Sequence, residues 1–180
     1  MARIVLTFGI IAGLIVSLLM VIGMTLLAGP DGVGSETAGY LTMLLALAFI
    51  FVAIKRHRDI NLGGVIRFWP ALATGLGVAV IAGLFYVITW EIYFNMTGGA
   101  FMDAYITAQI DGQRERGLTA GELAAYETSL RQSMALYANW WFRMPVTFTE
   151  IFPVGVLVSL VSAAILRNPV VIGAVPLEKV

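Results

Sequence analysis

Four long apolar segments decide what this chain can fold into. They cover about residues 4–28, 38–54, 70–94 and 142–166. A helix of roughly 17–25 mostly apolar residues crosses the hydrocarbon core of a bilayer, which is about 30 Å thick. The second segment is the shortest, and a turn rich in glycine and polar residues separates it from the first. The sequence therefore predicts an all-α integral membrane protein, a bundle of four membrane-spanning helices.

The composition supports a membrane environment. Of the 180 residues, 59% are hydrophobic and only 12% are charged, whereas a soluble domain has roughly 25% charged residues. The mean hydropathy of +0.90 points the same way. The net charge is zero and the basic residues do not form a stripe with interleaved aromatic residues, so we expect no nucleic-acid partner.

The residues that usually carry enzyme chemistry are scarce. The chain has no cysteine, which excludes a disulfide framework and thiolate chemistry. Its single histidine, His57, lies among Lys55, Arg56 and Arg58, which excludes sites with several histidine ligands and makes a Ser-His-Asp triad implausible. We also find no nucleophile with a base and no phosphate-binding loop. We therefore expect no metal, no cofactor and no enzymatic activity.

The cations predict the orientation of the chain. With four crossings, one side of the membrane receives Arg3, the basic cluster 55–58, Arg67, Arg167 and Lys179. The other side receives acidic or mixed loops, so the positive-inside rule places both termini in the cytoplasm. The tryptophans fall near the ends of the segments, as expected at membrane interfaces: Trp69, Trp90, Trp140 and Trp141. A cleaved signal peptide is the alternative for the first segment, but that segment is too long for one and residues 26–28 form a poor cleavage site.

The residues between the third and fourth segments form a separate unit. Apolar residues recur every three to four positions over 95–141, with Gly117 as a helix stop and Thr119 and Glu122 in the spacing of a capping box. We therefore expect residues 1–94 and 142–167 to form the bundle, 95–141 an extracytoplasmic helical hairpin, and 168–180 a cytoplasmic tail. The hairpin can pack on itself, on the bilayer surface or on a partner, and packing on itself is the commonest arrangement.

Each membrane segment carries small residues at helical spacing. Helices in lipid approach closely through such residues, because hiding apolar side chains from lipid stabilises little. We expect these rows to pack the helices within one chain, and a dimer through one row is the alternative. The second segment uses a seven-residue spacing, Gly39, Ala46 and Ala53, and the rows in the other three are Gly9, Gly13 and Ser17; Gly75, Ala79 and Gly83; and Gly155, Ser159 and Ala163.

A carboxylate lies inside the fourth segment. Glu150 is flanked by Thr147 and Thr149, and Pro153 leaves the carbonyl of Thr149 without its helical donor. Such a charge inside a membrane is costly unless it is paired, protonated or in contact with water. A nook of oxygen atoms for a cation or proton is therefore one interpretation.

The other interpretation is a structural ion pair. Arg143 can pair with Glu91, at the end of the third segment, or with Glu150, seven residues further along its own helix. We favour the structural pair, because two carboxylates without a histidine, lysine or second basic partner make an incomplete proton relay.

Three short motifs resemble a known family. They are residues 90–93, Trp-Glu-Ile-Tyr; residues 150–155, Glu-Ile-Phe-Pro-Val-Gly; and the cluster 55–59 followed by Gly63 and Gly64. Together they are similar to the bacterial membrane proteins grouped as domain of unknown function 4199, over nearly the whole chain. The resemblance implies a four-helix protein of the bacterial inner membrane. It implies no activity and no site residues.

These observations favour a non-enzymatic accessory or interaction module. Its partners would be the lipid bilayer and either a membrane protein or further copies of the same chain. The alternative is a small transporter or channel component that uses Glu150 and Glu91 for a proton or cation. A path for water that reaches Glu150 favours transport, whereas an ion pair sealed by aromatic side chains favours a scaffold. A membrane-embedded hydrolase would need a further polar residue near the two glutamates, and the sequence offers none.

Overall fold

Helices account for all the regular structure in the described part of the chain. The computed structural model describes residues 1–26, 36–97 and 99–168. The elements are α1 (Ala2–Leu26), α2 (Glu36–Leu47), α3 (Phe49–Arg56), a π-helical turn η1 (His57–Asn61), α4 (Phe68–Thr97), α5 (Ala100–Glu115), α6 (Ala120–Tyr137) and α7 (Trp140–Leu166). The predicted all-α architecture is confirmed.

Four helical segments are long and apolar enough to cross a membrane: Ala2–Leu26, Thr37–Asn61, Phe68–Thr97 and Trp140–Leu166. Their outward faces are also apolar, with leucines of α1 such as Leu14 and Leu18 56% and 61% exposed. A surface like this is stable in lipid and would aggregate in water. The protein is therefore a membrane protein. The expected turn between the first two segments and the expected tail lie mostly outside the described residues.

The second segment runs past its predicted end at residue 54. Lys55 and Arg58 each lie 2.7 Å from a carboxylate oxygen of Asp59, and this pairing keeps the charged residues helical through Asn61. The segment then ends at Gly63 and Gly64, whose φ angles of +66° and +93° favour glycine. The predicted segment is too short, because the prediction takes the first charged residue, Lys55, as the end of the helix. The other three helices begin or end within a few residues of the predicted bounds.

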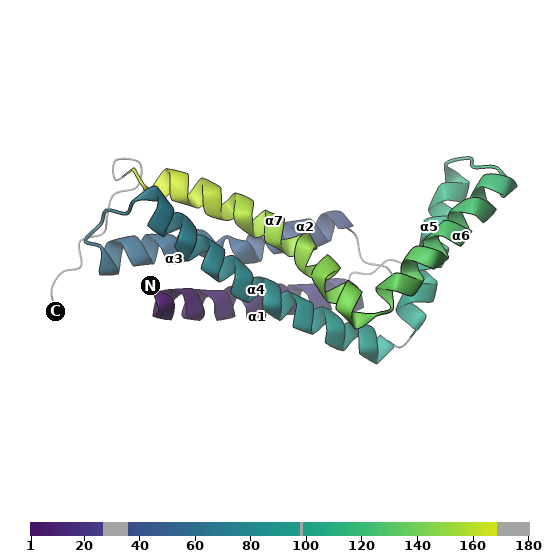
Figure 1. Cartoon of the computed structure of the whole chain (residues 1–180), viewed down its shortest axis with the longest axis horizontal. Helices are drawn as coiled ribbons and strands as arrows, with labels where there is room; N and C mark the ends of the chain where they lie inside the picture. The colour runs from purple at the N-terminus through teal and green to yellow at the C-terminus, as the bar shows by residue number, and fades with distance from the viewer. Residues whose placement is uncertain (27–35, 98, 169–180) are drawn as a thin grey trace.

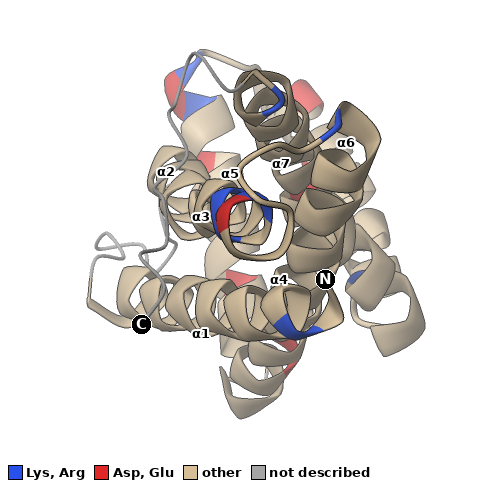
Figure 2. Ribbon diagram, turned by 90° about the vertical axis from the view of Figure 1, so that its left-hand side faces the viewer, with Lys and Arg blue, Asp and Glu red and all other residues tan. Residues whose placement is uncertain are grey.

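The membrane helices form a bundle from which the α5–α6 hairpin projects at one end (Figure 1). Helix α4 packs against both α1 and α7, and α3 contacts all three of these helices. The first turn of α1 and the last turn of α7 are both at the end opposite the hairpin, as an even number of crossings requires (Figure 1). Basic segments of the ribbon are visible at this end (Figure 2).

Helix α1 contacts α4 through its small residues. A Cβ atom added to Gly13 would lie 2.6 Å from the Phe85 ring, and one added to Gly9 would lie 2.7 Å from another α4 side chain. One turn further, the hydroxyl of Thr89 donates to that of Ser17 at 2.7 Å. The row 9–13–17 therefore lies directly against α4, within one chain.

Helices α4 and α7 also pack closely through small residues. A Cβ on Gly155 would lie 2.7 Å from the Cβ of Ala79, and one on Gly75 would lie 2.7 Å from the hydroxyl of Ser159. The hydroxyl of Ser159 is buried and donates to the carbonyl of Gly155 at 2.7 Å. Two further residues of these rows are enclosed by neighbouring side chains, Gly83 against Phe148 and Ala163 in the core.

The hairpin folds back at Gly117, whose φ angle is +86°. The N–H of Gly117 donates to the carbonyl of Arg114 at 3.0 Å, and that of Leu118 donates to Gln113 at 3.4 Å. This pair of bonds is a Schellman motif, which satisfies the last carbonyls of α5. The helix stop expected at Gly117 is present.

The next helix begins with the expected capping box. The side chain of Thr119 accepts from the backbone N–H of Glu122, and the carboxylate of Glu122 accepts from the backbone N–H of Thr119. The hydrogen bonds from Thr119 hold the pKa of Glu122 below its usual value. The two helices pack mainly on each other: α6 buries no residue fully and α5 buries only Ile106.

Replacing Gly117 with alanine should loosen the hairpin. An L-residue in the left-handed conformation costs roughly 1–2 kcal/mol, so α5 and α6 should separate more often. Limited proteolysis or amide hydrogen exchange of residues 113–122 would measure this opening. Gly121→Ala is the matched control, because nothing lies within 4 Å of a Cβ there and the site is the first turn of α6. Equal cleavage of both variants would contradict the prediction.

Candidate functional site

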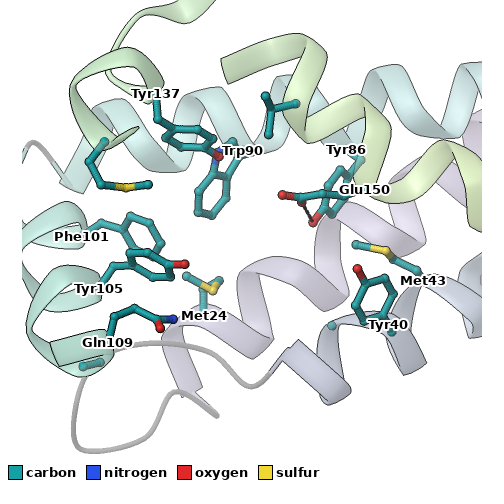
Figure 3. A pocket seen from close by; sticks show the side chains of 14 residues that line it. Met24, Tyr40, Met43, Tyr86, Trp90, Phe101, Tyr105, Gln109, Tyr137 and Glu150 are labelled. Carbon is teal, nitrogen blue, oxygen red and sulfur yellow. Dashed lines mark hydrogen bonds between the residues drawn. The ribbon is translucent and has the colours of Figure 1, made fainter. Parts of the chain in front are cut away.

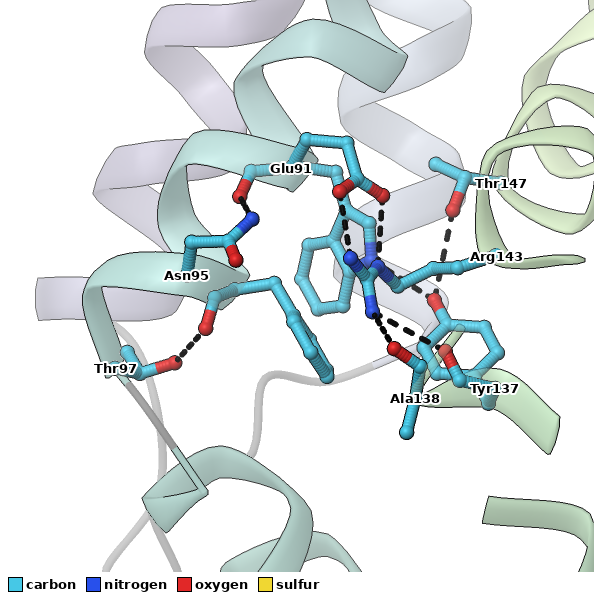
Figure 4. Close-up of polar contacts among 9 residues, drawn as sticks. Glu91, Asn95, Thr97, Tyr137, Ala138, Arg143 and Thr147 are labelled. Atoms are coloured by element: carbon cyan, nitrogen blue, oxygen red, sulfur yellow. Dashed lines mark hydrogen bonds and ion pairs between the residues drawn. The ribbon is translucent and has the colours of Figure 1, made fainter. Parts of the chain in front are cut away.

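The end of α4 and the start of α7, where the hairpin joins the bundle, hold a two-point ion pair (Figure 4). Arg143 donates from Nε to Oε1 of Glu91 at 2.7 Å and from Nη2 to Oε2 at 2.6 Å. The side chain of Arg143 is 3% exposed and that of Glu91 is 12% exposed. Of the two carboxylates that the sequence offered to Arg143, this fork-to-fork geometry selects Glu91.

Arg143 also ties the end of the hairpin to the bundle. Its Nη1 donates to the carbonyls of Tyr137 and Ala138, at 3.2 and 3.0 Å, where α6 ends. Its guanidinium carbon lies 3.9 Å from the centre of the Phe94 ring, a cation–π contact. One buried side chain therefore joins α4, the end of α6 and the first turn of α7.

Aromatic side chains complete this junction. The indole N–H of Trp90 donates to the hydroxyl of Tyr137 at 2.8 Å, and that hydroxyl lies 3.5 Å from Oγ1 of Thr147. The Trp90 ring also meets the edge of Phe101 from α5, with ring centres 5.1 Å apart. Burial raises the pKa of Tyr137 and keeps its phenol protonated. These contacts explain why the hairpin base is fixed while its tip projects.

Glu150 lies further along α7 than this ion pair. Glu150 is exposed, and its Oε2 accepts a hydrogen bond from the hydroxyl of Tyr86 at 3.4 Å. The two threonines next to it take other partners: Thr147 faces Tyr137, and the exposed Thr149 donates to the carbonyl of Val146 at 2.7 Å. We expected both threonine hydroxyls to gather around Glu150, and the structure shows that they bond elsewhere. Pro153 lies on the exposed face of α7, within a helix that runs on to Leu166.

A cavity of about 700 Å³ lies between the bundle and the foot of the hairpin (Figure 3). Glu150 and Tyr86 are in its wall, as are methionines from α1, α2 and α6. Among its described lining residues, Glu150 is the one charged side chain. Six rings form much of the remaining wall: Tyr40, Tyr86, Trp90, Phe101, Tyr105 and Tyr137.

Sequence reasoning found the carboxylate of this cavity but missed its aromatic wall. The rings come from α2, α4, α5 and α6, so no local spacing brings them together. A signal was present in the aromatic run at residues 90–94 and in Tyr105 and Tyr137, which lie at the base of the predicted hairpin. From the sequence we interpret Trp90 as an interface marker and as part of a family motif, and not as the wall of a cavity.

The charged cluster at the opposite end of the bundle is a separate feature. Arg58 is fully buried there, and Nδ1 of the buried His57 has no hydrogen-bond partner among the described residues. No group of three or more His, Cys, Asp or Glu side chains placed to hold a metal ion occurs in residues 1–26, 36–97 and 99–168. We therefore take the junction and its cavity as the candidate site.

Comparison with known proteins supports the resemblance of the motifs. A family model described as "Protein of unknown function (DUF4199)" matches residues 7–168. No curated protein and no solved structure matches the chain. The matched region contains the whole hairpin, the ion pair and the residues of the cavity wall. Since the match covers most of its length, the chain belongs to the DUF4199 family.

Proposed function

We propose that this membrane protein is a non-enzymatic accessory module that presents its hairpin to a partner, either another membrane protein or a second copy of the chain. The observation that carries the proposal is the fixed base of a projecting arm. Arg143, Glu91 and Tyr137 anchor the hairpin to the bundle, while α6 leaves every one of its residues at least partly exposed. Such an arm keeps its direction and leaves its sides open for contact.

Photocrosslinking tests this function directly. A photoreactive phenylalanine analogue replaces Gln132, which is exposed on α6, in the full chain at its native expression level. We expect one discrete crosslinked product, a dimer or a single partner. The matched control carries the analogue at Leu14, which is exposed on the lipid-facing side of α1, and should crosslink to lipid. A monomer at both positions would rule out the proposed role.

We also propose an orientation, with the hairpin outside the cytoplasmic membrane of a bacterium and both termini in the cytoplasm. The positive-inside rule supports it. The described cations near the ends of the membrane helices, apart from Arg143, belong to the end opposite the hairpin, and the cation that does lie next to the hairpin is neutralised by Glu91. The excess of positive charge at the end opposite the hairpin therefore favours one direction of insertion.

Single cysteines can test this orientation without background, because the chain has none of its own. In right-side-out vesicles, a membrane-impermeant maleimide should label Ser133→Cys in α6 and leave Asn61→Cys unlabelled until the membrane is opened. Both positions are exposed. The opposite labelling pattern would reverse the orientation, and labelling of both positions from outside would contradict the single crossing by α4 between them.

Transport is the second candidate, and the exposed position of Glu150 on the cavity wall is what favours it. Three observations count against a proton path. Glu91 is bound to Arg143, and no titratable residue occurs between Glu150 and Arg167 on α7 or between Arg67 and Tyr86 on α4. Buried hydroxyls in this region, such as that of Ser159, donate to their own helix. Flux across reconstituted vesicles that depends on pH and disappears in Glu150→Gln would favour transport over the accessory role.

A further inference from the structure

We propose that the cavity between the bundle and the hairpin is a binding site for an organic ammonium group, a single positive charge with apolar substituents. Its volume of about 700 Å³ falls in the range of roughly 300–1,000 Å³ that is usual for small-molecule sites. Residues of α5 and α6 form part of its wall, but the ligand that we propose follows from the chemistry of that wall and does not depend on the accessory role.

The charge of the wall selects a cation. Glu150 contributes a carboxylate, and none of the described lining residues is Lys, Arg or His. The adjacent cation, Arg143, already directs three nitrogens at Glu91 and the end of α6. An anionic ligand would therefore meet a negative wall, and an uncharged apolar ligand would strip water from the carboxylate without balancing its charge.

The rings and methionines select an organic cation over a metal ion. Aromatic faces attract quaternary and primary ammonium groups, and cages of several rings are a common way to recognise them. Trp90 and Tyr40 lie apart on the wall, and Tyr86 lies beside Glu150 (Figure 3). A hard cation such as Ca²⁺ needs six to eight oxygen ligands, whereas this wall is mainly aromatic and thioether.

The depth of the site allows two sources for this ammonium. Glu150 lies seven residues along α7 from Arg143, which places it roughly 10 Å below the outer junction at about 1.5 Å per residue. A lipid headgroup and a soluble amine can both reach that depth. The chemistry that the wall recognises is the same in the two cases.

The test uses the full chain in a maltoside detergent with phenyltrimethylammonium as the probe. Its uncharged carbon analogue, tert-butylbenzene, has the same shape without the charge. Fluorescence of Trp90 reports binding in a variant whose three other tryptophans, all 59–75% exposed, are replaced by phenylalanine. We expect saturable binding of the ammonium compound and at least tenfold weaker binding of the analogue, which corresponds to about 1.4 kcal/mol.

Variants separate a specific site from general adsorption. Glu150→Gln and Tyr40→Leu should each weaken binding of phenyltrimethylammonium, the first by at least about tenfold. Glu127→Gln removes an exposed carboxylate from α6, outside the cavity wall, and should bind as the parent protein does. Absent binding, equal binding of tert-butylbenzene, or unchanged binding in Glu150→Gln at an unchanged melting temperature would each overturn the proposal.

Nanodiscs identify the source of the ammonium. Phosphatidylcholine and an uncharged glycolipid both give membranes without net charge, but only the first carries a quaternary ammonium. Weaker apparent binding of the probe in phosphatidylcholine discs would support a lipid headgroup as the occupant. Equal binding in the two kinds of disc would support a soluble amine. Because the photocrosslinking of Gln132 reads the hairpin surface instead, either proposal can fail while the other stands.

Discussion

Replacing Glu91 with glutamine should lower the free energy of unfolding by about 3–5 kcal/mol, the usual cost of removing one partner from a buried ion pair. The reason is the charge that stays behind. Arg143 is 3% exposed and would keep its guanidinium beside the Phe94 ring with only uncharged acceptors, two backbone carbonyls and one side-chain amide oxygen. Reversible unfolding in mixed micelles with increasing SDS would measure the loss.

A matched control for this substitution lies on the hairpin surface. Glu127 and Arg131 pair at 2.8 Å, with side chains 39% and 57% exposed, so Glu127→Gln should cost less than about 1 kcal/mol. The double variant Glu91→Leu with Arg143→Met should recover part of the stability, because it leaves no buried charge. It should not recover all of it, since the two carbonyls at the end of α6 lose their donor. Equal costs for Glu91→Gln and Glu127→Gln would contradict a buried structural pair.

Replacing Gly155 with leucine should cost about 3 kcal/mol, at the upper end of the range for overpacked cores. The first added carbon would already lie 2.7 Å from the Cβ of Ala79. That Cβ is fixed to the α4 backbone and has no rotamer to change, so the whole helix must move away. The same unfolding assay, with crosslinking between α4 and α7 as a measure of their distance, would detect this.

Two variants show whether the effect is steric. Gly155→Ala combined with Ala79→Gly exchanges the methyl group between the two helices and should regain most of the stability lost in Gly155→Ala alone. Gly23→Ala adds a methyl group where nothing lies within 4 Å, and it should be neutral or slightly stabilising because alanine favours helix. A failure of the exchange to restore stability would locate the defect elsewhere than at the contact between residues 79 and 155.

The sequence predicts the membrane architecture well because that architecture follows from local patterns. Apolar length defines the four crossing helices, and Gly117 with the Thr119–Glu122 pair defines the hairpin. The error at the end of the second segment arose from pairing inside the helix. Asp59 neutralises both Lys55 and Arg58, so charged residues continue the helix.

The candidate site could be predicted only in part. Sequence spacing left two partners open for Arg143, because Glu91 lies 52 positions away and the choice depends on how α4 faces α7. The grouping of Thr147 and Thr149 with Glu150 assumed that neighbours in sequence share a site. In the structure the hydroxyl that bonds to Glu150 comes from Tyr86, on another helix. The cavity itself exists only when the hairpin and the bundle are both in place.

The central claim is that the two glutamates have different roles, Glu91 in holding the fold and Glu150 in the cavity wall. Unfolding of Glu91→Gln and Glu150→Gln, measured side by side in the same micelles, tests it most directly. We predict a loss of about 3–5 kcal/mol for Glu91→Gln. We predict a change within about 0.5 kcal/mol for Glu150→Gln, whose side chain is exposed and whose amide oxygen can still accept from Tyr86. Similar losses in the two variants would contradict this division of roles.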